Sequence, residues 1–169
     1  MRLKVLKENS DTALGKNSEV PSREEVERGD ASYGGLPIIY KPGRHEEASN
    51  HETEIWVSDK FFNYDIDIQR HILNHEVAHN LSDQLMSDNT GRWQEFCKAF
   101  IEERKTPVSS TAYKNGSRTY WVGLYGDIGA NSLSETVTRA ITEYLDDPER
   151  LKSRSEEAFS IIEDFMRLR

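Results

Sequence analysis

The chain has 169 residues, of which 36% are hydrophobic and 31% charged, with a formal net charge of −8 at pH 7. This length suits one compact domain with a single core. The acidic balance argues against a nucleic-acid partner, because phosphates repel negative side chains. The single cysteine, Cys97, excludes an intrachain disulfide and a cysteine-based zinc site.

No apolar run approaches the ~18 residues of a membrane-spanning helix. The first residues, MRLKVLKENSD, lack the apolar segment of a secretory signal. We therefore expect a soluble, monomeric protein that is made in the cytoplasm and has no membrane partner. Secretion, or injection into a target cell, by a route without a cleavable signal stays open.

The start of the chain is polar, without a sustained apolar period. This predicts a loose N-terminal arm at residues 1–30 and one domain at residues 31–169. Within the arm we expect a short strand at Leu3–Leu6 and a helical turn at Arg23–Arg28. The next stretch, LPIIYKPG, predicts a short strand at a sheet edge, because it contains two prolines.

A loop, GRHEEASNHE, separates this strand from TEIWVSDKF, where Ile55 and Val57 alternate with polar neighbours and predict a second, half-buried strand. From about Asp65 the apolar period changes from 2 to 3.6. This predicts a helix to about Met86, capped by Asp65 or Asn63. Its expected apolar stripe consists of Ile68, Ile72, Val77, Leu81 and Leu85.

The second half of the chain predicts further helices at about residues 92–103 and 133–145, and a last one in SEEAFSIIEDFMRLR. Ser132 or Ser134 can cap the helix at 133–145. A long Gly-, Ser- and Tyr-rich loop precedes that helix, and such loops often carry function. The expected fold class is α+β, mostly helical, with a small early sheet.

The stretch ILNHEVAHNL contains a His-Glu-x-x-His motif formed by His75, Glu76 and His79. On a helix the two histidines point the same way, so both imidazoles can reach one zinc ion. Glu76 is turned by about 100° from His75 and can instead take a proton from a zinc-bound water. The motif predicts a zinc site, and the alternative is a pair of surface histidines.

A catalytic zinc needs a third protein ligand and an open position. The candidates are Asp83, Asp127, Glu135 and Glu143. Asp83 lies on the helix of the histidines, and a single helix cannot easily surround a tetrahedral ion. We favour Glu135, which opens a second helix that can enclose the ion. Its alternative role is to stabilise the first turn of its own helix.

The long loop before Glu135 carries Tyr113, Tyr120 and Tyr125. A phenol near zinc can donate a hydrogen bond to the oxyanion that forms during peptide hydrolysis. Tyr125 is the nearest of the three to Glu135 in sequence and is therefore the candidate. Its alternative role is packing within the loop.

From the helix of His75 onward, the chain resembles the C-terminal protease domain of anthrax lethal factor, a domain type that includes the Pro-Pro endopeptidases. The resemblance covers roughly residues 54–169 and rests on the order of HEVAHNLSD, RWQEFCKAFIEER, LYGD, SETVTRAITEYL and ERLKSRSEEAFSIIEDF. It implies a gluzincin-like zinc protease. By position, the resemblance implies that His75, His79 and Glu135 are the zinc ligands. It implies that Glu76 is the general base and that Tyr125 stabilises the oxyanion.

The resemblance also implies that the strand EIWVS lies beside the cleft, where an extended substrate can add as a further strand. The chain departs from the family pattern at Arg139, where the family helix often carries a second acidic residue. It departs again in the longer gap between Tyr125 and Glu135. Tyr120 is the substitute for Tyr125 that this gap suggests.

The sequence therefore predicts a zinc-dependent endopeptidase that acts on a protein or peptide substrate and uses Zn²⁺ as its cofactor. Family members often act as toxins or injected effectors, so a bacterial toxin or effector protease is one expectation. One alternative is a zinc hydrolase of another substrate, such as a cell-wall peptide. The other is a non-catalytic peptide-binding domain, against which an intact Glu76 argues, since binding alone needs no general base.

Overall fold

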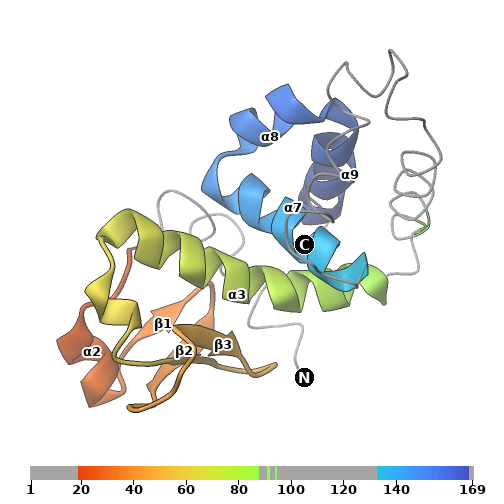
Figure 1. Cartoon of the computed structure of the whole chain (residues 1–169). Coiled ribbons are helices and arrows are strands. Elements are labelled where there is room, and N and C mark those ends of the chain that lie inside the picture. The colour runs from red at the N-terminus through yellow and green to blue at the C-terminus, as the bar shows by residue number, and fades with distance from the viewer. Residues whose placement is uncertain (1–18, 88–90, 92–93, 95–132, 168–169) are drawn as a thin grey trace. The chain divides into compact units, whose positions relative to one another are not determined.

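The computed structural model describes residues 19–87, 91, 94 and 133–167 (Figure 1). Its elements are helices and a small four-stranded sheet, so the predicted α+β, mostly helical class is confirmed. The chain divides into two compact units, Met1–Asn80 with Arg169 and Leu81–Leu168. The predicted strand at Leu3–Leu6, the helix at residues 92–103 apart from residue 94, and the long loop lie outside the described residues.

The sheet belongs to the first unit and has the order β1-β2-β4-β3. Its strands are β1 (Ser32–Tyr33), β2 (Leu36–Tyr40), β3 (Ala48–Asn50) and β4 (Ile55–Val57). β2 and β4 are parallel, whereas β1–β2 and β3–β4 are antiparallel. Ile38 pairs with Ile55, which pairs with Asn50, so these three side chains share one face of the sheet.

The prediction that LPIIYKPG is an edge strand is wrong, because β2 lies between β1 and β4. The amide of Ile38 donates to Ala31 in the β1 direction, at 2.9 Å. Backbone groups alternate in direction along a strand, so the nitrogen of Pro37 faces the β4 side. Pro37 comes one residue before Ile38, which pairs with Ile55, the first residue of β4. An interior strand tolerates the proline here because no ladder hydrogen bond falls at its position.

Two strands were missing from the sequence prediction. β3 lies within the segment that was expected to be a loop, and it is the strand beside β4 at the end of the sheet. β1 forms a two-residue hairpin with β2 through Gly34 and Gly35, whose φ angles are 57° and 79°. Positive φ at both turn positions is the reason for two glycines, because it matches the twist of the strands.

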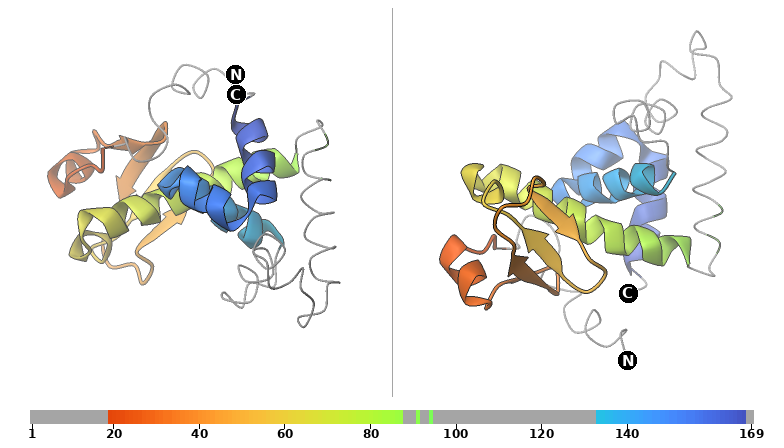
Figure 2. Two further views of the ribbon diagram at one scale, coloured as in Figure 1. Left: turned by 90° about the horizontal axis from the view of Figure 1, so that it is seen from above. Right: turned by 60° about the horizontal axis from the view of Figure 1, so that its bottom comes forward.

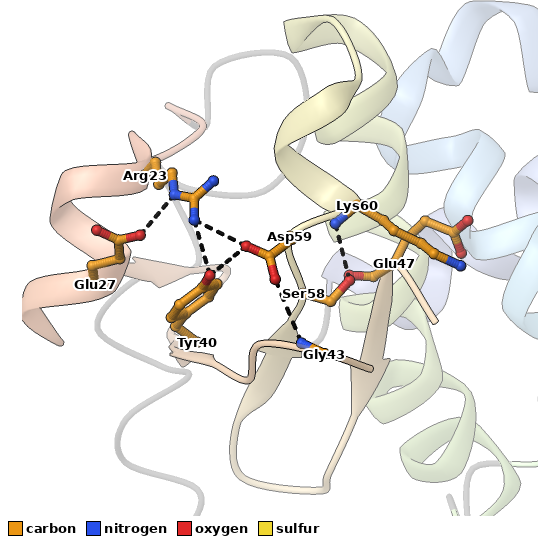
Figure 3. A network of polar contacts seen from close by, with 8 residues as sticks. All are labelled: Arg23, Glu27, Tyr40, Gly43, Glu47, Ser58, Asp59 and Lys60. Atoms are coloured by element: carbon orange, nitrogen blue, oxygen red, sulfur yellow. Dashed lines mark hydrogen bonds and ion pairs between the residues drawn. The ribbon is translucent and has the colours of Figure 1, made fainter. Parts of the chain in front are cut away.

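The helix α2 (Arg23–Arg28) confirms the predicted helical turn and begins with a capping box between Ser22 and Glu25. It contacts β2, and a polar network joins it to the sheet (Figure 3). Arg23 donates to the hydroxyl of Tyr40 and to the carboxylate of Asp59, both at 2.9 Å. The Tyr40 hydroxyl donates to the same carboxylate. The boundary predicted at residue 30 stays a prediction.

The longest helix, α3, spans Ile66–Met86, as predicted. Asp65 caps it by accepting a hydrogen bond from the Ile68 amide at 3.0 Å. The predicted stripe is partly wrong, because Ile68 is 43% exposed. The row that is buried consists of Leu73, Val77, Ala78, Leu81 and Leu85. The first turn of α3 therefore extends beyond the core, which the sequence period alone could not indicate.

The second unit contains α7 (Leu133–Asp146), α8 (Pro148–Arg154) and α9 (Glu156–Arg167). These three helices contact one another and form one group in both views of Figure 2. Ser134 lies within α7, so it is not the cap of that helix. The prediction missed α8, which begins after its N-cap, Asp147, with a proline at the first helical turn. None of the described helices is long and apolar enough to cross a membrane.

Candidate metal centre

His75 and His79 lie one turn apart on α3 and are both half-buried. Their ring centroids are 4.8 Å apart and their planes are inclined by 79°. This arrangement follows from the helix, which places residues i and i+4 on one face. Two ring nitrogens from one face of one helix are a common way of holding a transition metal.

The helix is fixed immediately before the first histidine. Asn74 is fully buried, and its side-chain oxygen accepts a hydrogen bond from the hydroxyl of Tyr33 at 2.8 Å. Tyr33 belongs to β1, so this bond ties α3 to the sheet. An amide that is satisfied in the core has few alternative positions, because leaving a buried polar group unpaired is costly.

Glu76, between the two histidines in the motif, is only 7% exposed. Its main-chain oxygen accepts a hydrogen bond from the side-chain amide of Asn50 at 2.9 Å. Glu76 is therefore a largely buried acid that directly follows His75 in the chain.

Glu135 completes a group of three possible metal ligands. One ligand atom from each of His75, His79 and Glu135 lies within 4.8 Å of the others. Among the residues that the structure describes, no other group of His, Cys, Asp or Glu side chains meets this condition. Ligand atoms around a tetrahedral zinc with bonds of about 2.0–2.1 Å are about 3.4 Å apart. Two imidazoles and one carboxylate form a donor set that a divalent transition metal accepts.

Arg139 forms an ion pair with Glu135, the candidate third ligand. Its Nε atom lies 3.7 Å from a carboxylate oxygen of Glu135, one turn away on α7. The Glu135 side chain is 24% exposed, so water screens this ion pair only in part.

Of the other candidates for the third ligand, Asp83 and Glu143 are described by the structure, and neither belongs to the group. Asp83 is exposed near the end of α3. Glu143 is buried in the second unit, where Arg154 and Arg150 lie 2.8 Å and 3.3 Å from its carboxylate. Two arginines already neutralise the charge of Glu143, so its carboxylate has a structural role in the second unit. Asp127 lies outside the described residues.

The predicted oxyanion-stabilising residue, Tyr125, and its substitute, Tyr120, also lie outside the described residues. The roles of His75, Glu76, His79 and Glu135 stay predictions, although the structure brings the three ligand side chains together. Sequence reasoning missed Asn50 and the other polar residues that fix α3. No local pattern could have found them, because the Asn50 contact joins residues 26 positions apart.

His51, which follows β3 in the chain, makes two side-chain contacts. Its ring stacks on that of Trp56 with the centroids 3.7 Å apart, and its Nε2 lies 3.1 Å from the hydroxyl of Ser49. This histidine therefore belongs to the face of the sheet that carries Trp56, and it is not in the ligand group.

Comparison with known proteins adds no relative to this picture: no family model matches the chain, and neither a curated protein nor a solved structure does.

Proposed function

We propose that the chain is a zinc-dependent endopeptidase, of the type that the resemblance to the anthrax lethal factor protease domain suggests. One observation carries the proposal: two histidines one helical turn apart and one carboxylate have their ligand atoms within 4.8 Å of one another. Glu76 follows the first of these histidines directly in the chain. A metal-binding role alone would not require a buried acid at this position.

In this proposal His75, His79 and Glu135 hold the ion. Zinc in such a site supplies Lewis acidity, which polarises a peptide carbonyl and brings the pKa of a water ligand toward ~7. Glu76 accepts the proton from the attacking water and then delivers it to the leaving amine. The limited exposure of Glu76, 7%, supports this role because it keeps competing bulk water away from the carboxylate.

The strand order changes which strand we expect an extended substrate to pair with. β4, the strand EIWVS that the resemblance suggested, is paired with β2 on one side and β3 on the other. A peptide cannot add to a strand whose two edges are occupied. β3 is the end strand of the described sheet, so we propose Ala48–Asn50 as the strand that would receive the peptide.

Metal content tests the proposal. Purified wild-type protein, Glu135→Ala and Asp83→Ala are reconstituted with Zn²⁺, dialysed and assayed by elemental analysis. We expect one zinc per chain in the wild type and in Asp83→Ala, the matched control. We expect weakened binding in Glu135→Ala, by about tenfold or more.

Absence of zinc from reconstituted wild type would overturn the proposal and favour the non-catalytic peptide-binding alternative. Equal retention by Glu135→Ala would leave a metal site but remove Glu135 from it. Zinc-bound protein that cleaves cell-wall peptides and no protein library would favour the other alternative, a zinc hydrolase of a different substrate.

A further inference from the structure

The turn between β3 and β4 contains an unusual backbone conformation. Glu52 has a φ of 54° and is the only non-glycine residue with positive φ among those that the structure describes. A residue with a Cβ adopts this left-handed region at an energetic cost, so neighbouring contacts must hold it there. Two asparagine side chains provide these contacts.

Asn50 and Asn80 bind the two polar groups of the Glu52 backbone. The Glu52 amide donates to the side-chain oxygen of Asn50 at 3.1 Å. The Glu52 carbonyl accepts a hydrogen bond from the side-chain amide of Asn80 at 3.0 Å. Asn80 is the residue that follows His79 on α3, so the turn is tied directly to the helix of the motif.

Asn50 makes a second link from the same side chain. Its amide nitrogen donates to the main-chain oxygen of Glu76 at 2.9 Å. In an α-helix that oxygen is also the acceptor for the backbone amide of Asn80, four residues on. The four residues Asn50, Glu52, Asn80 and Glu76 therefore form a closed ring of hydrogen bonds, which we name the asparagine clasp.

The clasp joins the end strand of the sheet to the motif at defined points. Asn50 is the last residue of β3, and both helical members of the clasp lie within one residue of a histidine of the motif. The hydrogen bond from the Glu52 amide to the Asn50 side chain is the one that an asparagine-stabilised turn requires. The two bonds to α3 link chain positions 26 and 28 residues apart, and neither is among the hydrogen bonds within residues 50–54.

We propose that Asn50 and Asn80 are positioning residues that fix the end strand β3 to the His-Glu-x-x-His helix. The inference rests on the proposed function, because a fixed spacing between β3 and the metal has a use only where a bound peptide must present its carbonyl there. In this proposal a bound metal restricts the motion of α3, and the clasp transmits this restriction to the turn. Metal binding and the mobility of the turn are therefore coupled.

Backbone hydrogen exchange with and without Zn²⁺ tests the coupling in the full chain. Asn50→Asp removes the donor to the Glu76 oxygen and keeps the acceptor for the Glu52 amide. Asn80→Ala removes the other bond to α3 while improving helix propensity, so its helix should stay folded. Asn63→Asp is the matched control, since Asn63 is exposed and outside the clasp.

In the wild type we expect Zn²⁺ to slow exchange at residues 51–54 by about threefold or more. In Asn50→Asp and Asn80→Ala we expect zinc affinity, measured by competition with a chelator, to stay within about threefold of wild type. Exchange at the turn should then be insensitive to Zn²⁺. A loss of general stability would instead speed exchange throughout the chain and leave the zinc effect in place.

The outcomes separate this inference from the proposed function. A wild-type chain that binds no Zn²⁺ would overturn the proposed function, and with it the coupling. A wild-type chain that binds Zn²⁺ without any change at residues 51–54 would overturn the clasp inference alone. Retention of the zinc effect in both variants would also overturn it.

Discussion

The hydrogen bond between Tyr33 and Asn74 gives a quantitative prediction. Replacing Tyr33 by Phe keeps the ring and removes the hydroxyl that donates to Asn74 at 2.8 Å. The two residues are 3% and 0% exposed, so water cannot readily replace the lost donor. A net hydrogen bond contributes about 0.5–1.5 kcal/mol, and leaving a buried acceptor without this donor costs about 1–3 kcal/mol. We therefore expect Tyr33→Phe to lower the free energy of unfolding by about 1–3 kcal/mol.

Urea unfolding followed by circular dichroism measures this change, with Tyr64→Phe as the matched control. Tyr64 is 38% exposed and its hydroxyl lies 3.2 Å from a carboxylate oxygen of Glu47, so water can replace that bond. We expect a loss of no more than about 0.5 kcal/mol there. Equal destabilisation by the two substitutions would refute the reasoning, because the expected loss depends on the burial of the hydroxyl. Tyr33→Phe should also weaken zinc binding, because Asn74 precedes His75.

Two further predictions concern the site and the surface network. Glu76→Gln should keep zinc within about threefold and lower peptide hydrolysis by about 10²-fold or more, as measured with quenched fluorescent peptides, because the amide cannot accept the proton; unchanged hydrolysis would remove Glu76 from the mechanism. The second concerns Asp59, whose pKa is held below its ordinary value of 3.8, chiefly by the hydrogen bond from the Tyr40 hydroxyl. Its contribution to stability is complete above the unfolded-state pKa and is lost as the pH falls through the lower folded-state pKa. Acid unfolding below about pH 4 should therefore be less steep in Asp59→Asn than in the wild type, and parallel curves would contradict this.

The sequence could predict those parts of the fold that depend on local pattern. α3 was predictable because its apolar period is local to the helix and its cap, Asp65, directly precedes it. The strands β1 and β3 have two and three residues, too few to show an alternation. The sequence of β1 nevertheless contains a hairpin signal, the two glycines after Tyr33, which was not used.

The part of the site on α3 was predictable for the same reason, because the spacing of the two histidines fixes their common face. The third candidate ligand could not be chosen from local pattern, because Glu135 and Glu143 differ only in their tertiary surroundings. Glu143 pairs with two arginines, whereas Glu135 belongs to the group of three possible metal ligands. The clasp was not predictable, since asparagines 26 and 28 residues from their partners give no local signal.

The stretch from Asn74 to Asn80 shows how one helical segment can serve several tasks. Successive residues of a helix are turned by about 100°, so pairs spaced by four form separate rows. His75 and His79 form the row of the candidate metal site, while Glu76 and Asn80 form the adjacent row, which binds the β3–β4 turn. Asn74 accepts the bond from β1 on a further side.

Because these rows are adjacent, a displacement of one affects the others. Inserting a single residue just before the first histidine would turn both histidines by about 100° relative to the upstream part of the helix. The insertion would move His75 and His79 toward the β3–β4 turn, and it would move Glu76 and Asn80 away from that turn. Metal binding and the left-handed turn at Glu52 would then be lost together, whereas a substitution in either row disturbs them separately. The sequence Asn-His-Glu-x-x-His-Asn therefore defines both the proposed ligands and their orientation toward the sheet.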